Sequence, residues 1–365
     1  MRAPVVERFS LSDAYLIVQR WAPVKRLYYL MYETPFHTQP LDTLAFLVTG
    51  GAGFIGSNLV EYLLKYGAKE VRVLDNFSNG FRKNVALFQD NPALRVIEGD
   101  IRDPETCRDA CQGIDIVLHQ AALGSVPRSI NDPITSNDVN VGGFVNMLVA
   151  AKEANVKRFV YAASSSTYGD HKALPKIEDR IGKPLSPYAV TKYVNELYAD
   201  VFGKTYGMEL IGLRYFNIFG PRQDPNGAYA AVIPLFIDAV LEARPPRMNG
   251  DGGQTRDFTF VENCVQANIK AALVDNKEAV NQVYNIAVAD RTSLNDLFNI
   301  LKEEAGSNIT PEYGPDRIGD IRDSLADISK AQTLLGYDPK IRIREGLQQT
   351  LAWFRTHQEF IAERS

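Results

Sequence analysis

The segment Thr49-Gly50-Gly51-Ala52-Gly53-Phe54-Ile55-Gly56 follows an apolar run, Leu44–Thr49, and precedes a helical pattern over Ser57–Tyr66. Spaced glycines between an apolar run and a helix are typical of a turn that joins a strand to a crossover helix. Glycines at this spacing also allow the backbone to approach a pyrophosphate at the N-terminus of the helix. Taken alone, the segment fits an ordinary turn as well as a phosphate-binding turn.

A carboxylate downstream favours the phosphate-binding interpretation. Asp75 closes the next apolar run, Val71–Leu74, and lies near the offset of ~20 residues expected of the acid that binds an adenosine ribose. Strand, glycine turn, helix and acid together predict a dinucleotide site. Because a carboxylate at this position repels a 2′-phosphate, we expect NAD rather than NADP, although Arg82 and Lys83 lie nearby.

Further short apolar runs are separated by helical spacings along most of the chain. They are Leu94–Glu98, Ile116–His119, Phe159–Ala163, Leu210–Tyr215 and Tyr284–Val288. Short buried strands that alternate with helices predict an α/β fold with a Rossmann-type doubly wound parallel sheet, because parallel strands need crossover helices. Frequent turns after Phe219 predict a second, smaller C-terminal domain that is discontinuous in sequence.

These patterns suggest a division of the chain. We expect an N-terminal arm over residues 1–43 and a dinucleotide-binding domain over 44–217, with a return strand near 283–289. The smaller domain takes residues 218–282 and 290–355, and 356–365 form a tail. Leu11–Arg20 fits a short amphipathic helix in an arm that packs on the body. A second interpretation makes Met31 the natural start.

The composition excludes several classes of protein. Hydrophobic residues make up 45% and charged residues 23% of the 365 residues, which is ordinary for a folded globule and excludes disordered and fibrous chains. A formal charge of -4 without a block of like charges argues against nucleic-acid and membrane surfaces. The three cysteines, Cys107, Cys111 and Cys264, suit neither a disulfide framework nor a zinc site. We therefore expect a cytoplasmic protein without a metal.

Two further patterns contain candidate catalytic and ligand-binding side chains. Tyr188 and Lys192 are four residues apart and so share a helix face. An ammonium group beside a phenol lowers the pKa of the phenol from about 10, which would make Tyr188 a base near neutrality. The alternative is a surface tyrosine beside a solvated lysine. Ser164, Ser165 and Ser166 end the run that starts at Phe159, where open α/β sheets bind ligands, although serines also cap helices and form turns.

With the glycine turn, the serine strand end and Tyr-x-x-x-Lys in this order, the chain resembles the extended short-chain dehydrogenase/reductase superfamily from Leu44 to about Phe354. More narrowly, it resembles the UDP-N-acetylhexosamine 4-epimerases. The narrower resemblance is carried by His119–Ser129, Ser164–Asp170, Ser186–Tyr193, Arg214–Phe219, Gln223–Pro234 and Arg317–Asp327. It implies a homodimeric isomerase with tightly bound NAD that interconverts UDP-GlcNAc and UDP-GalNAc, with UDP-Glc and UDP-Gal as further candidates. The smaller domain would bind the UDP-sugar.

The resemblance also implies roles for matching residues. Tyr188 would be the catalytic base, Lys192 would hold the nicotinamide ribose and Ser164 would bind the 4-hydroxyl of the sugar. The cofactor would contact Gly50, Gly53, Phe54, Ile55, Gly56, Asp75, Asn76, Asp100, Ile101, Ala121, Ala122, Tyr188, Lys192 and Tyr215. The substrate would contact Gly124, Ser125, Ser164, Ser165, Ser166, Asn217, Ala230, Ala231, Val232, Arg256, Arg317, Asp320 and Ser324. Pro221 and Asp323 depart from the family, whose members often carry Arg and His there.

Ser324 bears on the choice of sugar. It matches a position at which glucose-only epimerases of the family tend to carry a bulky aromatic residue. A small side chain leaves room beside C2 of the sugar, so we expect N-acetylated sugars to be accepted. The alternative is a plain exposed serine without a role in selectivity.

Three other functions were weighed. Nucleotide-sugar 4,6-dehydratases need an Asp-Glu pair where this chain has Ser165 and Ser166, which argues against dehydration. A UDP-glucuronate or N-acetylhexosaminuronate 4-epimerase, or a UDP-glucuronate decarboxylase, stays open because the groups that meet a C6 carboxylate decide it. A non-catalytic NAD-binding sensor is disfavoured because Ser164, Tyr188 and Lys192 are all present.

Overall fold

The computed structural model describes residues 31–225, 231–315 and 322–358. The chain divides into two compact units, Met1–Pro35 and Phe36–Ser365. The predicted helix Leu11–Arg20 lies outside the described residues, and the predicted domain bounds stay a prediction. Within the second unit, the ring of Phe36 stacks on that of Tyr62, with ring centroids 5.1 Å apart.

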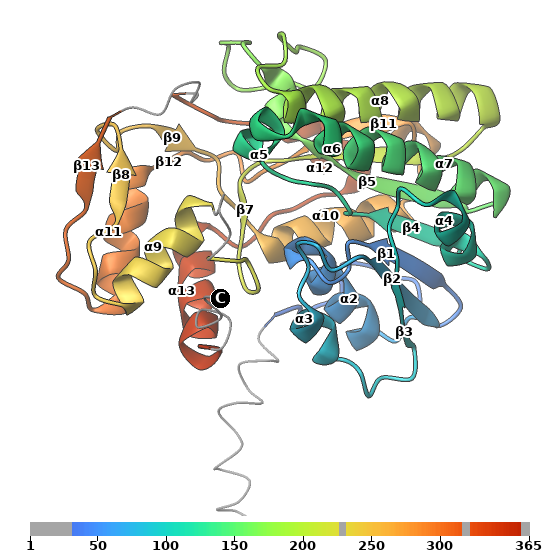
Figure 1. Cartoon of the computed structure of the whole chain (residues 1–365), viewed down its shortest axis with the longest axis horizontal. Coiled ribbons are helices and arrows are strands. Elements are labelled where there is room, and N and C mark those ends of the chain that lie inside the picture. The colour runs from blue at the N-terminus through green and yellow to red at the C-terminus, as the bar shows by residue number, and fades with distance from the viewer. Residues whose placement is uncertain (1–30, 226–230, 316–321, 359–365) are drawn as a thin grey trace, which may run out of the picture. The chain divides into compact units, whose positions relative to one another are not determined.

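A seven-stranded parallel sheet organises the second unit (Figure 1). Its strands in spatial order are β11 (Gln282–Ile286), β6 (Leu210–Tyr215), β5 (Arg158–Ser164), β4 (Ile116–His119), β1 (Ala45–Thr49), β2 (Glu70–Asp75) and β3 (Leu94–Glu98). The chain builds outward from β1 to β3 and then returns to β4 on the other side of β1. This order confirms the predicted Rossmann-type doubly wound sheet.

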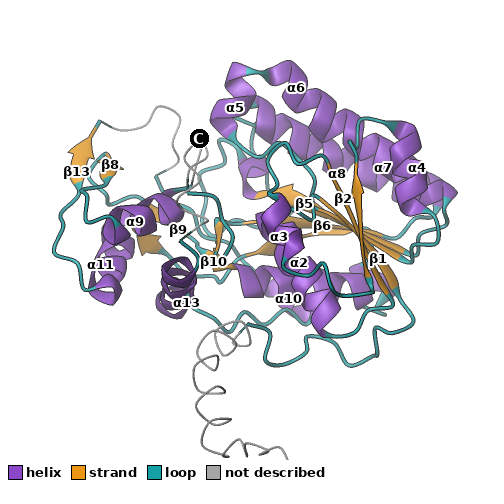
Figure 2. Ribbon diagram, turned by 60° about the horizontal axis from the view of Figure 1, so that its bottom comes forward, coloured by secondary structure: helices purple, strands orange, loops and turns teal. Residues whose placement is uncertain are grey.

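Helices cover both faces of the sheet, as Figure 2 shows. One face carries α4 (Pro104–Cys111), α7 (Gly143–Glu153) and α8 (Pro187–Tyr206), and the other carries α2 (Phe54–Lys65) and α10 (Val261–Leu273). The core beneath α4, α7 and α8 includes Leu47, Val117, Phe144 and Phe159, each at most 1% exposed. Burial of these side chains is the main favourable contribution to this layered packing.

The elements differ from the sequence-based expectation in some boundaries and in the burial of one strand. Helix α2 begins at Phe54, because the last residues of the glycine segment already form its first turn. The run Leu94–Glu98 was read as buried, but β3 is an edge strand and Val96 is 42% exposed. Strand β11 ends at Ile286 rather than Val288, because the N–H of Val288 donates to Asp257 Oδ1 at 3.0 Å.

Many of the remaining elements belong to a smaller region built after β6 and β11. The helices are α3 (Arg82–Ala86), α5 (Val126–Asn131), α6 (Pro133–Asn137), α9 (Val232–Leu241), α11 (Leu294–Ala305), α12 (Ser329–Leu335) and α13 (Ile343–Thr356). The strands pair as β7 (Ile218–Phe219) with β10 (Thr259–Phe260), β8 (Arg247–Asn249) with β13 (Glu312–Gly314), and β9 (Thr255–Arg256) with β12 (Thr292–Ser293). Helix α11 packs against α9 and α13.

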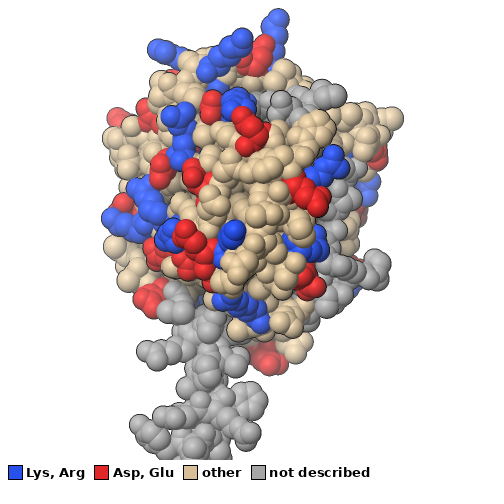
Figure 3. Space-filling view, turned by 90° about the vertical axis from the view of Figure 1, so that its left-hand side faces the viewer, with Lys and Arg blue, Asp and Glu red and all other residues tan. Residues whose placement is uncertain are grey.

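The surface over the smaller region mixes the two signs of charge. Figure 3 shows Lys, Arg, Asp and Glu side chains interspersed on this face rather than gathered by sign. Among the described residues, no helix combines the length and the apolar character that a membrane span requires.

Candidate active site

A cavity of about 570 Å³ lies at the carboxyl ends of the central strands. Open α/β sheets bind ligands at this edge, where the strand order reverses. Every residue predicted to contact the cofactor lines the cavity. These residues are Gly50, Gly53, Phe54, Ile55, Gly56, Asp75, Asn76, Asp100, Ile101, Ala121, Ala122, Tyr188, Lys192 and Tyr215.

The glycine turn brings backbone to the cavity in a way that side chains would prevent. Gly50 has a φ of +66°, and a Cβ added at Gly56 would lie 2.1 Å from the carbonyl oxygen of Gly50. Gly53 is the N-cap of α2 and no side chain caps this end of the helix. The first N–H groups of α2 therefore lack helical partners and suit the oxygens of a pyrophosphate.

Asp75 connects the glycine turn to the end of β2. Its Oδ2 accepts a hydrogen bond from Ala52 N at 2.9 Å, and its Oδ1 accepts one from Phe77 N at 2.8 Å. Burial raises the pKa of this carboxyl, and the two backbone bonds partly offset that effect. The acid thus fixes the turn as well as facing the cavity.

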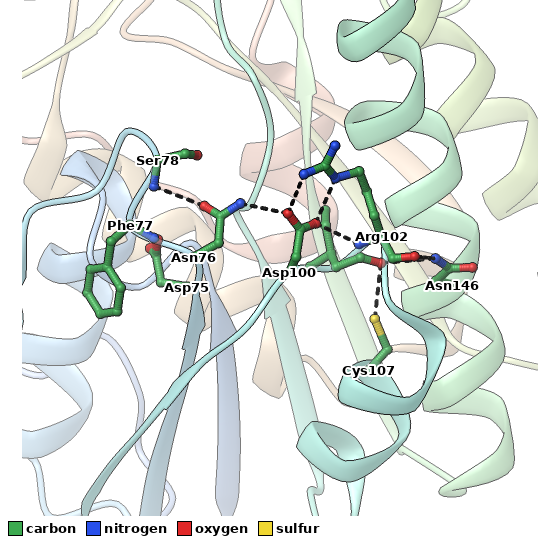
Figure 4. Close-up of polar contacts among 9 residues, drawn as sticks. Asp75, Asn76, Phe77, Ser78, Asp100, Arg102, Cys107 and Asn146 are labelled. Atoms are coloured by element: carbon green, nitrogen blue, oxygen red, sulfur yellow. Dashed lines mark hydrogen bonds and ion pairs between the residues drawn. The ribbon is translucent and has the colours of Figure 1, made fainter.

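The next acid belongs to a network on the same rim, drawn in Figure 4. Asp100 accepts a forked pair of bonds from Arg102, at 3.1 Å from Nε and 2.7 Å from Nη2. Asn76 Nδ2 donates to Asp100 Oδ2 at 2.9 Å. Hydrogen bonding with Arg102 is the main cause that lowers the pKa of Asp100 to about 2. This end of the cavity therefore offers fixed acceptors and an amide, groups that suit a nucleoside.

Ser164, Tyr188 and Lys192 meet at another part of the cavity. Helix α8 begins at Pro187, where Ser186 caps it by accepting a bond from Ala189 N at 3.1 Å. Ser164 and Tyr188 both line the cavity, and the hydroxyl of Ser164 acts to lower the pKa of Tyr188. Lys192 Nζ donates to the carbonyl oxygen of Ala162 on β5 at 2.9 Å. A phenol, a hydroxyl and an ammonium group are therefore held beside one another at the end of β5.

The pKa of Tyr188 departs from the prediction. The sequence led us to expect that Lys192 lowers it, but burial raises it, and the interaction with Ser164 offsets this only in part. The prediction was wrong because it ignored desolvation, which also lowers the pKa of Lys192 to about 8. A phenol this well buried needs a further positive charge in the cavity to ionise near neutrality.

His119 is a fully buried histidine that feels the charge of Lys192. His119 closes β4, and its Nδ1 is 2.8 Å from Thr49 Oγ1, which also accepts a bond from Ala121 N. Complete burial, together with the charge of Lys192, lowers the pKa of His119 to about 3. The imidazole therefore orders the ends of β1 and β4 without adding charge.

The predicted substrate residues are only partly brought together. Gly124, Ser164, Ser165 and Asn217 line the cavity. Other predicted contacts do not line it, namely Ser125, Ser166, Ala231, Val232, Arg256 and Ser324. Ala230, Arg317 and Asp320 lie outside the described residues.

Some of the residues outside the lining have other partners. Ser125 caps α5 by accepting a bond from Arg128 N, and Ser166 Oγ donates to Ser164 Oγ at 2.9 Å. Arg256 Nη1 donates to the backbone oxygen of Thr255 at 2.9 Å. Of these contacts, only that of Ser166 reaches a residue that lines the cavity, Ser164.

Two glutamines line the cavity without having been predicted. Gln120 directly follows β4, and its Oε1 accepts a bond from the hydroxyl of Tyr215 at 3.0 Å. Because ligands bind at the carboxyl ends of such strands, this position could have identified Gln120 as a candidate site residue from the sequence. Gln223 lies in a turn that the sequence does not place, and its buried Oε1 has no hydrogen-bond partner among the described residues.

We expect Gly56→Ala to weaken binding of NAD by at least about tenfold, because the new Cβ would displace the turn from the helix N-terminus. Equilibrium binding by calorimetry measures the change. Gly142→Ala is the matched control, since a Cβ there meets nothing within 4 Å. Equal affinity in the two variants would show that the turn does not hold the dinucleotide.

Comparison with known proteins adds to this geometry. The NAD dependent epimerase/dehydratase family matches residues 46–287. The putative UDP-glucose 4-epimerase of Methanocaldococcus jannaschii is 37% identical over 313 residues, which cover 85% of this chain and 98% of that protein.

Two solved structures have a similar fold over 86% of this chain. The UDP-N-acetylglucosamine 4-epimerase from Methanobrevibacter ruminantium M1, in complex with UDP-N-acetylmuramic acid, superposes with a TM-score of 0.81 at 38% identity, covering 86% of this chain and 98% of that one. The UDP-glucuronic acid 4-epimerase from Bacillus cereus, with UDP-glucuronic acid and NAD, has a TM-score of 0.79 at 32% identity and covers 86% and 99%.

Proposed function

Because the chain belongs to the NAD-dependent epimerase/dehydratase family, we infer that it is a nucleotide-sugar 4-epimerase, and we propose UDP-GlcNAc and UDP-GalNAc as its substrates. The observation that carries the reaction is the cluster of Ser164, Tyr188 and Lys192 in the cavity formed by the glycine turn. The sugar pair is supported by the similarity to a UDP-N-acetylglucosamine 4-epimerase. The size-selecting role of Ser324, which does not line the cavity, comes from the family resemblance.

The residues of the cluster have distinct tasks. When bound, NAD supplies the oxidation of C4 and its reversal, and its positive ring favours the phenolate of Tyr188. Tyr188 takes the proton of the 4-hydroxyl and returns it to the oxygen after the 4-keto sugar has turned over. Ser164 interacts with the phenol of Tyr188 and orients the same hydroxyl. Lys192, anchored to Ala162, holds the nicotinamide ribose and keeps positive charge near the phenol.

The turn that follows Ser164, which begins with Ser165 and Ser166, favours epimerisation over dehydration. Ser165 lines the cavity, and the hydroxyl of Ser166 donates to Ser164. Neither hydroxyl exchanges protons readily at neutral pH, so the turn lacks the acid and base that elimination of water requires. The same groups are sufficient to orient a sugar that is only oxidised and reduced at C4.

A uronate is the second candidate substrate. The chain is 32% identical to a UDP-glucuronic acid 4-epimerase over 86% of its length, so a sugar with a C6 carboxylate is a serious alternative. Parallel assays of UDP-GlcNAc, UDP-glucose and UDP-glucuronate, with NMR of the products, decide between them. Turnover of UDP-glucuronate without turnover of UDP-GlcNAc would overturn the proposed sugar pair.

We also propose that two copies of the chain associate through helix α8. One face of α8 is buried, while the opposite face exposes Val190, Leu197, Tyr198 and Val201, each 39% to 52% exposed. The neighbouring α5 and α6 add the exposed side chains of Ile130 and Ile134. An apolar stripe of this kind is typical of an interface between subunits.

Replacing Tyr188 by Phe is expected to reduce turnover by at least about 10²-fold, because it removes the base. Binding of UDP and NAD should be unchanged, since the hydroxyl alone is lost. Tyr206→Phe, at the exposed end of α8, is the control and should keep normal rates. Near-normal turnover by the Tyr188→Phe variant would exclude the mechanism.

Substituting Ser324 by Tyr tests the sugar pair. We expect kcat/KM for UDP-GlcNAc to fall at least about tenfold more than kcat/KM for UDP-glucose, because the ring fills the space beside C2. Ser324→Ala is the control and should preserve the ratio of the two. Equal losses on both sugars would remove Ser324 as a selector of size.

Leu197→Glu introduces a charge at the centre of the α8 stripe. Light scattering should give twice the 40.7 kDa of the chain for the natural protein and a single chain for the variant, because an unpaired buried carboxylate opposes association. Leu235→Glu, at an exposed leucine on α9, should leave the dimer intact. A monomeric natural protein would contradict the proposal.

A further inference from the structure

A buried ion pair joins helix α8 to the sheet. Arg214 on β6 donates from Nε to Glu196 Oε1 at 2.8 Å and from Nη2 to Glu196 Oε2 at 2.7 Å. The side chains are only 4% and 7% exposed. Two parallel bonds between planar groups fix orientation as well as distance. Because burial of two charges is costly, such a pair is weak evidence for stability and invites another explanation.

The position of Glu196 relates the pair to the reaction. Glu196 follows Lys192 by four residues and Tyr188 by eight, so the three side chains lie on one face of α8. Arg214 lies opposite Ala163 in the pairing of β5 with β6, one residue before Ser164. The pair therefore ties the helix that carries Tyr188 to the strands beside Ser164.

Arg214 also contacts the turn that follows Ser164. Its guanidinium lies 4.9 Å from the ring centre of Tyr168, the last residue of the turn Ser165–Tyr168. The hydroxyl of Tyr168 donates to Asn285 Oδ1 at 2.6 Å, and Arg214 Nη1 donates to the carbonyl oxygen of Glu178 at 2.9 Å. The arginine thus lies between the two segments that supply the catalytic groups.

We propose that Arg214 and Glu196 are positioning residues, which set the separation and the angle between Tyr188 on α8 and Ser164 at the end of β5. Neither side chain lines the 570 Å³ cavity, so neither meets the sugar or the dinucleotide directly. The proposal rests on the 4-epimerase function proposed above and extends it to residues outside the cavity.

Other charged groups surround the pair and are relevant to its test. Glu178, Asp200 and Lys330 line a separate hollow of about 220 Å³ beside Arg214 and Glu196. The buried phenol of Tyr161 also interacts with the pair. A substitution should therefore change one partner without altering these neighbours.

Glu196→Gln keeps the shape of the side chain and removes its charge, and Glu196→Asp keeps the charge and shortens the reach. We expect both variants to lose at least about tenfold in kcat, because small misplacements of reacting groups are costly. KM for the UDP-sugar and the amount of bound NAD should stay within about twofold, since the binding groups are untouched.

A second ion pair, at the opposite end of the sheet, provides the control, although its carboxylate is partly exposed and also pairs with Lys277. Arg158, at the other end of β5, donates from Nη2 to Glu209 Oε2 at 2.7 Å, with side chains 9% and 26% exposed. Glu209→Gln removes a comparable contact far from the cavity. Its kcat should stay within about twofold of normal, which separates positioning from a general loss of stability. An equal loss of kcat in Glu209→Gln would overturn the proposal.

The pH dependence of kcat in Glu196→Gln distinguishes a displacement of the catalytic groups from a simple loss of negative charge. Removing a negative charge would by itself lower the pKa of Tyr188. Moving Ser164 away from Tyr188 would instead raise the pKa of Tyr188, because the interaction with Ser164 lowers it. We therefore expect the acid limb of the kcat profile to move to higher pH in Glu196→Gln. A shift to lower pH, or none, would contradict the proposal.

Carbon-13 NMR of labelled tyrosine measures the pKa of Tyr188 directly, without turnover. The Tyr188→Phe variant identifies the resonance of Tyr188, because that resonance is missing from its spectrum. A raised pKa of Tyr188 in Glu196→Asp, which retains the carboxylate, supports positioning, and an unchanged pKa in both variants refutes it. If the natural protein has no 4-epimerase activity, the proposed function is refuted instead. The two failures are distinguishable because the NMR titration reports the contact of Tyr188 without requiring turnover.

Discussion

The pairing of β1 between β2 and β4 is the constraint on which the site depends. Thr49 lies opposite Leu74 on one side and His119 on the other. The chain leaves β1 toward one edge of the sheet and returns through β4 toward the other edge. The loops after these strands therefore diverge, and the space between them cannot be filled by a crossover helix. The order of the strands is therefore enough to create the cavity, and the side chains then shape it.

The two ends of the cavity are built by different means. The nucleoside end relies on backbone and short-range contacts, with the Asp75 carboxylate accepting two backbone N–H groups. The reacting end relies on long-range packing, since α8 must bring Tyr188 and Lys192 to β5. This difference suits the proposed 4-epimerase mechanism, in which NAD stays bound in a rigid site while the sugar needs room to rotate.

What the sequence could predict follows the same division. The glycine turn, Asp75 and the parallel strands are local patterns, and the structure contains them within a few residues of the expected bounds. The exposed face of β3 and the raised pKa of Tyr188 depend on what the rest of the chain covers or leaves open. Gln223 reaches the cavity from a turn whose path only the folded chain defines. Burial and loop path, rather than residue type, limited the prediction.

The state of His119 has a consequence for regulation by acidity. Histidine is the side chain whose ordinary pKa lies in the physiological range, yet complete burial holds this imidazole uncharged, with a pKa of about 3. Moderate acidification of the surroundings therefore leaves it unchanged. A change of pH by a fraction of a unit near neutrality therefore leaves the charge of this imidazole unchanged, and any effect on the reaction has to arise from other groups.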